Sequence, residues 1–391
     1  MPPSAAFHVT PVLPYWRLSG FYFAYFALLG GVAPFLALYF DHLGFSAARI
    51  GELIAIPMLM RCVAPNLWGW LGDVSGRRLA IVRVGALFTA IAFTGIFYRQ
   101  DYLWLALIMA SHSFFWHAVL PQFEAITLSH LGPQSARYSM VRLWGSVGFI
   151  ATVVGLGLLL EMFSLDIYPA VMLAIMLAIF CSSLIVPRPP IAAARPKGEP
   201  VERFFMLLRK PGVLAFFICV GLMQFSHGPY YTFLTLHLEA LGYSRGLIGL
   251  LWALGVVAEI LLFLVMTRVL ARFTLKQVLM ASLLLASLRW VLLGTLAEHL
   301  WVLLLVQVLH AATFGSFHVA AIHFIQRNFN ERLQGQGQAL YASLSGVGGA
   351  LGALYSGYSW TTLGAHWTFA IAGLAALIAA MGLYRALPSD R

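Results

Sequence analysis

The segment "GWLGDVSGRR", residues 69–78, is a short polar break between two long apolar runs. Gly72 and Gly76 permit close packing and backbone conformations that other residues avoid. Asp73 can face a helix amino terminus, and the two arginines at the end of the segment favour the cytoplasmic side of a membrane. The segment therefore predicts a tight cytoplasmic turn between two helices that cross a bilayer in opposite directions.

The composition places the whole chain in a membrane. Of 391 residues, 61% are hydrophobic and only 10% are charged, and the mean hydropathy is +0.86. A soluble protein of this length could not bury so much apolar surface. The net charge of +10 does not indicate nucleic-acid binding, because the basic residues lie in short loops between apolar runs. We expect no metal or cofactor, and the three cysteines (Cys62, Cys181 and Cys219) are expected to be small packing residues without a disulfide.

Apolar runs recur along the entire chain, each near the ~20 residues that cross ~30 Å of hydrocarbon. The first run is too long for the hydrophobic part of a signal peptide, so it is expected to be a retained span. The runs lack the alternation of β-barrel strands. We therefore predict an all-α integral membrane protein with twelve transmembrane helices. The predicted spans are 15–40, 48–71, 79–97, 102–128, 137–160, 166–186, 212–238, 246–267, 275–296, 301–324, 335–358 and 364–384.

The distribution of lysine and arginine predicts the orientation. If the amino terminus is cytoplasmic, 18 of the 24 basic residues lie in cytoplasmic segments. Three lie on the opposite side and three lie inside spans. This asymmetry follows the positive-inside rule, with both termini in the cytoplasm of an inner-membrane protein. The residues on the opposite side are Arg49, Arg99 and Arg245, and those inside spans are Arg61, Arg142 and Arg289.

The longest polar segment, residues 187–210, is rich in proline and basic residues. It separates six predicted spans from another six. We interpret it as a cytoplasmic linker between an amino-terminal bundle, residues 1–186, and a carboxyl-terminal bundle, residues 211–391. Such a division is typical of secondary transporters built from repeats, whose site lies at the midplane between the halves.

The opening segment resembles the loop motif of the major facilitator superfamily, G-x-L-x-D-R/K-x-G-R/K-R/K. Val74 departs from the pattern, where the family usually has a basic residue. Four further stretches, "VRLWGSVGF", "GVVAEILLF", "LRW" and "LHAATFGSFHVAA", resemble the phenylpropionate (aromatic acid) permease branch, which is similar in layout to the lactose and nucleoside proton symporters. The matching motif residues are Gly69, Leu71, Asp73, Gly76, Arg77 and Arg78.

Ionisable side chains inside spans are costly and indicate function by default. Glu124 and Arg142 each lie about nine residues from the turn between their predicted spans, so both are about 13 Å from it on antiparallel neighbours. Glu259 and Arg289 repeat this arrangement in the second half. Each carboxylate is therefore expected to offset the arginine near it. Glu52 and Arg61 are interpreted as structural residues nearer to span ends, where long side chains can reach water.

The resemblance to lactose permease implies roles for these positions. Glu124 and Arg142 correspond to its sugar site, and Glu259, Arg289 and His318 correspond to its proton-coupling residues. The second carboxylate of that family has no counterpart, because Ala321 occupies its position.

Aromatic and histidine side chains complete the predicted site. Phe149 lies almost two helical turns after Arg142 and is expected to stack on a substrate ring. His227 and Tyr231 lie where Gly228 and Pro229 break a span, and broken helices tend to line cavities. His310 shares a broad helix face with His318 and is a further candidate for proton coupling.

These patterns predict a monomeric, proton-coupled importer that works by alternating access and catalyses no reaction. The resemblance implies a small aromatic carboxylate as substrate. The expected partners are that solute, protons and the lipid bilayer. Alternatives left open are a sugar or nucleoside symporter, an efflux antiporter for hydrophobic compounds, and a transporter-like sensor or lipid-binding protein. No nucleotide-binding loop is present in the sequence, which favours the proton gradient as the energy source.

Overall fold

The computed structural model describes residues 13–189 and 201–387, with side chains described from 204 onward in the second part, and is helical almost throughout. The first half consists of α1 to α6 with short 3₁₀ turns between some of them. The bounds are α1 (Tyr15–His42), α2 (Ala47–Ser75), α3 (Arg78–Phe93), α4 (Tyr102–Leu131), α5 (Tyr138–Met162) and α6 (Tyr168–Leu184).

The second half contains two interrupted spans. α8 and α9 are separated at His227, and α12 and α13 are joined by a π-helical turn, Ala311–Gly315. The last helix, α14, reverses direction at Gly364, where φ is +80°. The bounds are α7 (Val201–Leu208), α8 (Pro211–Ser226), α9 (Gly228–Ala240), α10 (Arg245–Arg272), α11 (Leu275–Leu296), α12 (Leu300–His310), α13 (Ser316–Asn328) and α14 (Gln334–Ala386).

The twelve predicted spans all correspond to helix. Nine segments of the described chain are long and apolar enough to cross a membrane. Two of them, Tyr102–Met162 and Gln334–Ala386, contain a reversal and so hold two crossings each. α2 is less apolar, but it packs against α4 and α14 among the other helices. The predicted all-α membrane fold with twelve crossing helices is confirmed.

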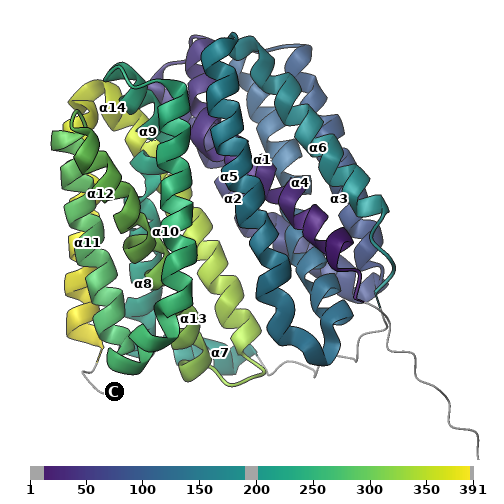
Figure 1. Cartoon of the computed structure of the whole chain (residues 1–391). Coiled ribbons are helices and arrows are strands. Elements are labelled where there is room, and N and C mark those ends of the chain that lie inside the picture. The colour runs from purple at the N-terminus through teal and green to yellow at the C-terminus, as the bar shows by residue number, and fades with distance from the viewer. Residues whose placement is uncertain (1–12, 190–200, 388–391) are drawn as a thin grey trace, which may run out of the picture.

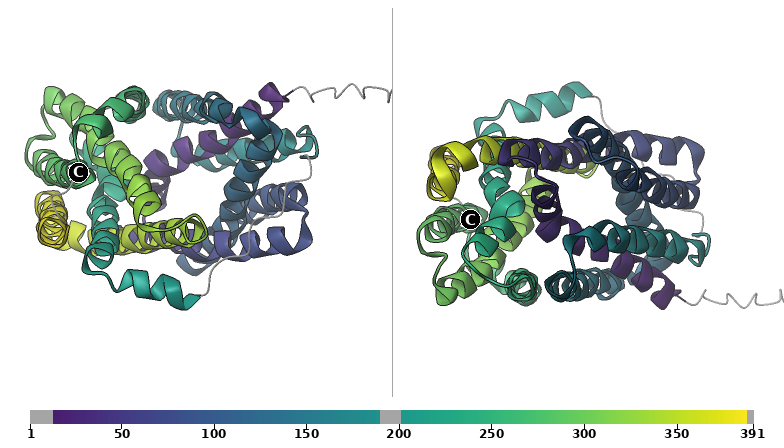
Figure 2. Two further views of the ribbon diagram at one scale, coloured as in Figure 1. Left: turned by 90° about the horizontal axis from the view of Figure 1, so that it is seen from below. Right: turned by 90° about the horizontal axis from the view of Figure 1, so that it is seen from above.

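The two halves stand side by side (Figures 1 and 2). α1 to α6 form one group and α8 to α14 the other, while α7 runs along the outer edge of the molecule, crosswise to the remaining helices. The halves meet where α2 packs on α14 and where α5 packs on α10. Residues 190–200 of the predicted linker lie outside the described residues.

The two halves pack closely at the end of the molecule opposite to α7. Gly157 of α5 lies so near α10 that an added Cβ would be 2.7 Å from the carbonyl oxygen of Arg245. Arg245 Nη1 donates a hydrogen bond of 2.8 Å to Leu160 O. Across the other interface, Tyr358 donates from its hydroxyl to Glu52 Oε1 at 2.5 Å. These contacts hold the two halves together at this end.

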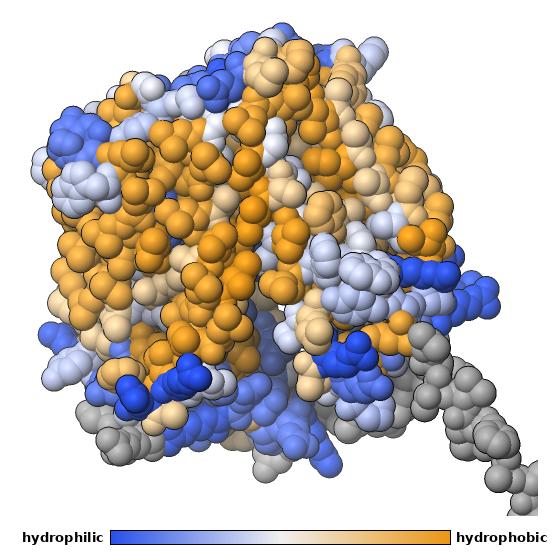
Figure 3. All heavy atoms as spheres, viewed as in Figure 1, coloured by the Kyte–Doolittle hydropathy of each residue, from blue (hydrophilic) through white to orange (hydrophobic). Residues whose placement is uncertain are grey.

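At the opposite end, which carries α7 and the carboxyl terminus, the surface between the halves is hollowed (Figure 3). The half of α2 that leads to this end exposes large apolar side chains, including Leu59, Val63 and Leu67. An orange band of apolar residues covers the flanks of the molecule in Figure 3, and part of the exposed surface of α2 would contact lipid in the same way. The structure is therefore a state that is packed at one end and open at the other.

The turn motif adopts the predicted geometry. Gly76 ends α2 with φ of +65°, and its N–H bonds to Gly72 O. Gly72 faces Gln122 so closely that an added Cβ would be 2.5 Å from Oε1. Asp73 forms an ion pair with Arg78, the first residue of α3, and Arg78 Nη1 donates to Gln122 Oε1 at 2.8 Å. Gly69 has open space around it, so its place in the motif has no packing explanation here.

Two glycines on α5 test the importance of close approach between the halves. Gly157→Ala and Gly155→Ala raise helix propensity equally, by about 1 kcal/mol. Only Gly157 has α10 within reach of a new methyl group, while Gly155 has nothing within 4 Å. We expect Gly157→Ala to lower the free energy of unfolding by about 1–3 kcal/mol relative to Gly155→Ala. Thermal unfolding of the two purified variants measures this, and equal midpoints would contradict the account.

Candidate functional site

Arg289 of α11 is the centre of a buried polar network in the second half. Its side chain has no solvent exposure. Nε donates to Val306 O at 2.9 Å, and Nη1 donates to Thr313 Oγ1 at 3.3 Å. The guanidinium carbon lies 4.2 Å from the centroid of the Tyr230 ring. An arginine can remain charged at such a site because acceptors and a ring face replace its water shell.

His310 connects Arg289 to Glu259. Arg289 Nη1 lies 3.1 Å from His310 Nδ1, and His310 Nε2 lies 3.4 Å from Glu259 Oε1. Arginine can only donate, so Nδ1 of His310 must accept. The proton of the neutral imidazole is then on Nε2, the nitrogen that faces the carboxylate. Arg289 therefore fixes a tautomer whose Nε2–H faces the carboxylate, and this N–H favours the charged form of Glu259.

The π-helical turn after His310 helps to build this network. A π turn contains one extra residue per turn, and such turns are frequent at functional sites. Thr313 lies in the turn, and its hydroxyl is the one that accepts from Arg289. Sequence analysis identified His310 but did not find the π turn, Thr313 or Gln307. The small residues of "AATFG" were the only signal, and they are also compatible with a plain helix.

Aromatic residues from the break between α8 and α9 form one wall of the network. His227 lies at the predicted break, and Nδ1 bonds to Met223 O at 2.8 Å. Tyr230 donates from its hydroxyl to Gln307 Oε1 at 2.7 Å. The ring of Tyr231 lies 6.0 Å from that of His227 and 6.3 Å from that of His310, so the three rings form one cluster. Among the described residues, His227 Nε2 has no hydrogen-bond partner, which leaves a polar group available to a ligand or water.

The corresponding charges in the first half are arranged differently. Glu124 accepts a hydrogen bond from the hydroxyl of Tyr138 at 3.1 Å. The guanidinium carbon of Arg142 lies 3.7 Å from the centroid of the Phe26 ring. Glu124 and Arg142 act on each other electrostatically. They form no direct ion pair within the described part of the chain.

Two predicted site residues lie away from these clusters. Phe149 is buried in the contact between α5 and α1, where its backbone approaches Gly30. His318 is on α13 and accepts or donates a 2.9 Å hydrogen bond with the hydroxyl of Tyr341. The structure therefore brings Glu259, Arg289 and His310 together, with His318 separate from them.

The prediction that Arg61 lies near a span end is wrong. α2 extends from Ala47 to Ser75, so Arg61 is at its centre. The predicted span 48–71 also has Arg61 near its middle, so the interpretation as a residue near a span end did not follow from the span itself. Glu52, by contrast, does lie near a helix end and pairs with Arg49 at 2.9 Å, as expected of a structural residue.

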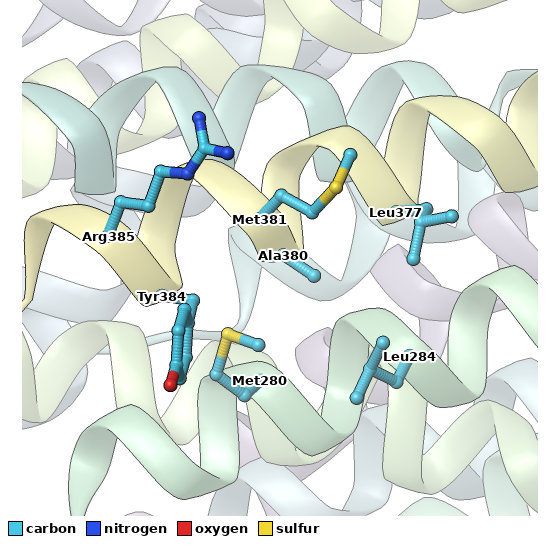
Figure 4. A pocket seen from close by; sticks show the side chains of 7 residues that line it. All are labelled: Met280, Leu284, Leu377, Ala380, Met381, Tyr384 and Arg385. Atoms are coloured by element: carbon cyan, nitrogen blue, oxygen red, sulfur yellow. The ribbon is translucent and has the colours of Figure 1, made fainter.

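A pocket on the outer flank is separate from these ionisable residues (Figure 4). It lies between α11 and the end of α14, and its lining is mainly apolar. None of the predicted site residues belongs to it. The lining residues are Met280, Leu284, Leu377, Ala380, Met381, Tyr384 and Arg385.

The fold and the buried ionisable network define a multi-pass membrane transporter of the major facilitator type. Residues 15–371 match the model of the family described as "MFS_1 like family", and the chain belongs to this family. Its relatives are permeases, so the protein is a transporter of small molecules and not an enzyme.

Named relatives cover almost the whole chain. A protein of Escherichia coli (strain K12) named "Probable 3-phenylpropionic acid transporter" is 28% identical over 379 residues, covering 96% of this chain and 98% of its own length. The maltose permease of Geobacillus stearothermophilus is 27% identical and covers 86% and 84% respectively. The solved structure of a mutant of the nucleoside transporter NupG is similar in fold, with a TM-score of 0.86 at 18% identity over 96% of this chain and 100% of that one.

The role of Arg289 can be tested by its removal. Arg289→Ala leaves the carbonyl of Val306, the hydroxyl of Thr313 and the ring of His310 without their common donor. We expect it to reduce the free energy of unfolding by about 3–5 kcal/mol. Arg289→Lys should also be destabilised, because an ammonium cannot reach all three acceptors from one plane. Arg272→Ala, an exposed arginine at the end of α10, is the matched control in thermal unfolding. An Arg289→Ala midpoint equal to that of the control would contradict the network.

Proposed function

We propose that this protein imports a small organic solute together with protons, by alternating access of a central site to the two sides of the inner membrane. Both termini would be cytoplasmic, and the hollow end would face the cytoplasm. The bundles 1–186 and 211–391 would move as two bodies within a monomer. The packed and open ends of the present structure support such a rocking motion.

The observation that carries the proton-coupling part is the chain Glu259–His310–Arg289. Burial in the membrane interior favours protonation of a carboxylate, because the neutral form has a smaller desolvation cost than the charged form. Arg289 opposes this by favouring the charged form. A motion that changes the distance between these groups would therefore change the proton affinity of Glu259. This is the property that a proton symporter needs.

The substrate part of the proposal is an aromatic carboxylate. It is supported by the similarity to the protein named as a 3-phenylpropionic acid transporter and by the many aromatic side chains in the interior, including Tyr230, Tyr231 and Phe26. Glu124, Arg142, Phe149, His227 and Tyr231 are the proposed substrate residues. Glu259, Arg289 and His310 are proposed for proton coupling, with His318 in a supporting role.

Glu259→Gln should separate exchange from accumulation. Glutamine keeps the size and polarity of the side chain but cannot cycle a proton. We expect purified Glu259→Gln protein in vesicles to exchange labelled 3-phenylpropionate at a rate near that of the parent. Under an inward proton gradient, the variant should no longer accumulate the compound inside the vesicles. Glu298→Gln, at an exposed loop position, is the matched control.

The same uptake must be measured with protein-free vesicles, because a neutral aromatic acid crosses a lipid bilayer without a transporter. Accumulation by Glu259→Gln equal to that of the parent would show that Glu259 is not the coupling residue. Accumulation of labelled maltose or uridine, but not of 3-phenylpropionate, would contradict the substrate assignment and leave the coupling intact.

A further inference from the structure

Arg61 occupies an unusual position at the middle of α2. The next residue, Cys62, faces α14, since its Sγ lies 3.2 Å from Ser343 O. One turn earlier, Pro57 O bonds to the ring of His117 on α4 at 3.1 Å. Residues four apart share a helix face, so Arg61 lies on the side of α2 that turns towards α4. The rest of the protein leaves its side chain uncovered, although the residue stands at the middle of a helix that crosses the membrane.

The charge of Arg61 acts on side chains from both halves of the molecule. A group that influences both sets lies between the two halves. His318 supports this placement, because it is reached by solvent although protein encloses it on most sides, as expected of a cavity-lining residue. The titratable residues within the electrostatic range of Arg61 are Tyr25, Cys62 and His117 in the first half, and Tyr231, His318 and Tyr341 in the second.

The charges inside the membrane do not balance without a ligand. Glu124 acts on Arg142, and Glu259 is connected to Arg289 through His310. Glu52 is bonded to Arg49 near the helix end. Arg61 has neither a hydrogen bond nor an ion pair with any part of the chain that the structure describes. A positive charge left over at this depth is costly and favours the binding of an anion.

We propose that Arg61 is the carboxylate-binding residue of the central site, and that it recognises an aromatic monocarboxylate through its guanidinium group. The assignment rests on the proposed function and makes its substrate class specific. A guanidinium matches the two oxygens of a carboxylate with two parallel hydrogen bonds. The anion would supply the missing negative charge. Arg61 thereby differs from Arg142, which has the carboxylate of Glu124 within its electrostatic range.

The side chains around Arg61 explain why the anion would carry a ring. Five of the six titratable groups in its electrostatic range are tyrosine or histidine, the sixth being the neighbouring Cys62, and several have their polar atoms already engaged. Tyr25 donates to Trp116 O at 3.5 Å, and Tyr341 bonds to His318. Engaged polar ends leave apolar ring surface for contact with a flat apolar group. Simple inorganic anions would gain nothing from this lining.

Tyr231 offers a link between the substrate and the proton. It is within electrostatic range of Arg61 and also of Glu259 and Arg289. A carboxylate held at Arg61 would therefore lie between the first half and the buried network of the second. Binding in that position gives the ligand contacts to both moving bodies, which is what a rocking transporter requires.

Titration calorimetry on the purified protein tests this without a proton gradient. The probes are 3-phenylpropionate and its uncharged analogue 3-phenylpropionamide. We expect the parent to bind the acid more tightly than the amide. Arg61→Gln should bind the acid about 10- to 100-fold more weakly and lose the preference for acid over amide. Arg61→Lys should recover part of the affinity, and Arg272→Gln should bind as the parent does.

Thermal unfolding of the ligand-free variants provides a second readout. Removal of an uncompensated charge should leave the midpoint of Arg61→Gln equal to that of the parent or higher, whereas removal of a structural arginine would lower it. The proposal is overturned if Arg61→Gln binds the acid as tightly as the parent, if only Arg142→Gln loses the acid, or if the parent binds neither probe. A failure of proton-driven uptake with binding intact would instead contradict the proposed coupling and leave this assignment standing.

Discussion

Arg289 is a charged side chain with no solvent exposure in a helix that crosses the membrane. The rest of the site follows from what this charge requires. Val306 and Thr313 accept from it, Tyr230 presents a ring face, and His310 relays its effect to Glu259. The break between α8 and α9 and the π turn after α12 are the backbone features that bring these groups together. Irregular backbone is tolerated at this depth because protein surrounds it.

The contacts between the two halves must also be satisfied within the membrane. Their contact at one end depends on glycines such as Gly157, which allow helix backbones to touch. Such contacts can be exchanged for similar contacts at the other end at little net cost, because lipid chains are as apolar as the side chains they replace. In the proposed mechanism, water in the hollow between the halves would lower the cost of the charge of Arg61 until an anion replaces that water. Charge balance and alternating access are in this way connected.

Much of this organisation could be predicted from the sequence. The lengths of the apolar runs and the positions of the basic residues predicted the membrane crossings. The "HGP" triplet at 227–229 predicted the broken span, because glycine and proline interrupt a helix locally. Glu259 and Arg289 do lie near each other, with His310 between them, but the sequence could not distinguish His310 from His318 for this position. His310 and His318 are equivalent by pattern, and the π turn that separates their environments depends on packing against α10 and α11. Arg61 was interpreted as a residue near a span end, although the predicted span 48–71 and the helix Ala47–Ser75 both have it near the middle.

We propose that one carboxylate, Glu259, carries one proton for each anion held at Arg61. Transport would then be electroneutral. Uptake of labelled 3-phenylpropionate into vesicles should be measured under an imposed pH gradient and, separately, under an imposed potassium potential, with uptake by Glu259→Gln vesicles subtracted. The account predicts uptake that follows the pH gradient and is unaffected by the potential. Uptake driven by the potential alone, or equal with and without the pH gradient, would contradict it.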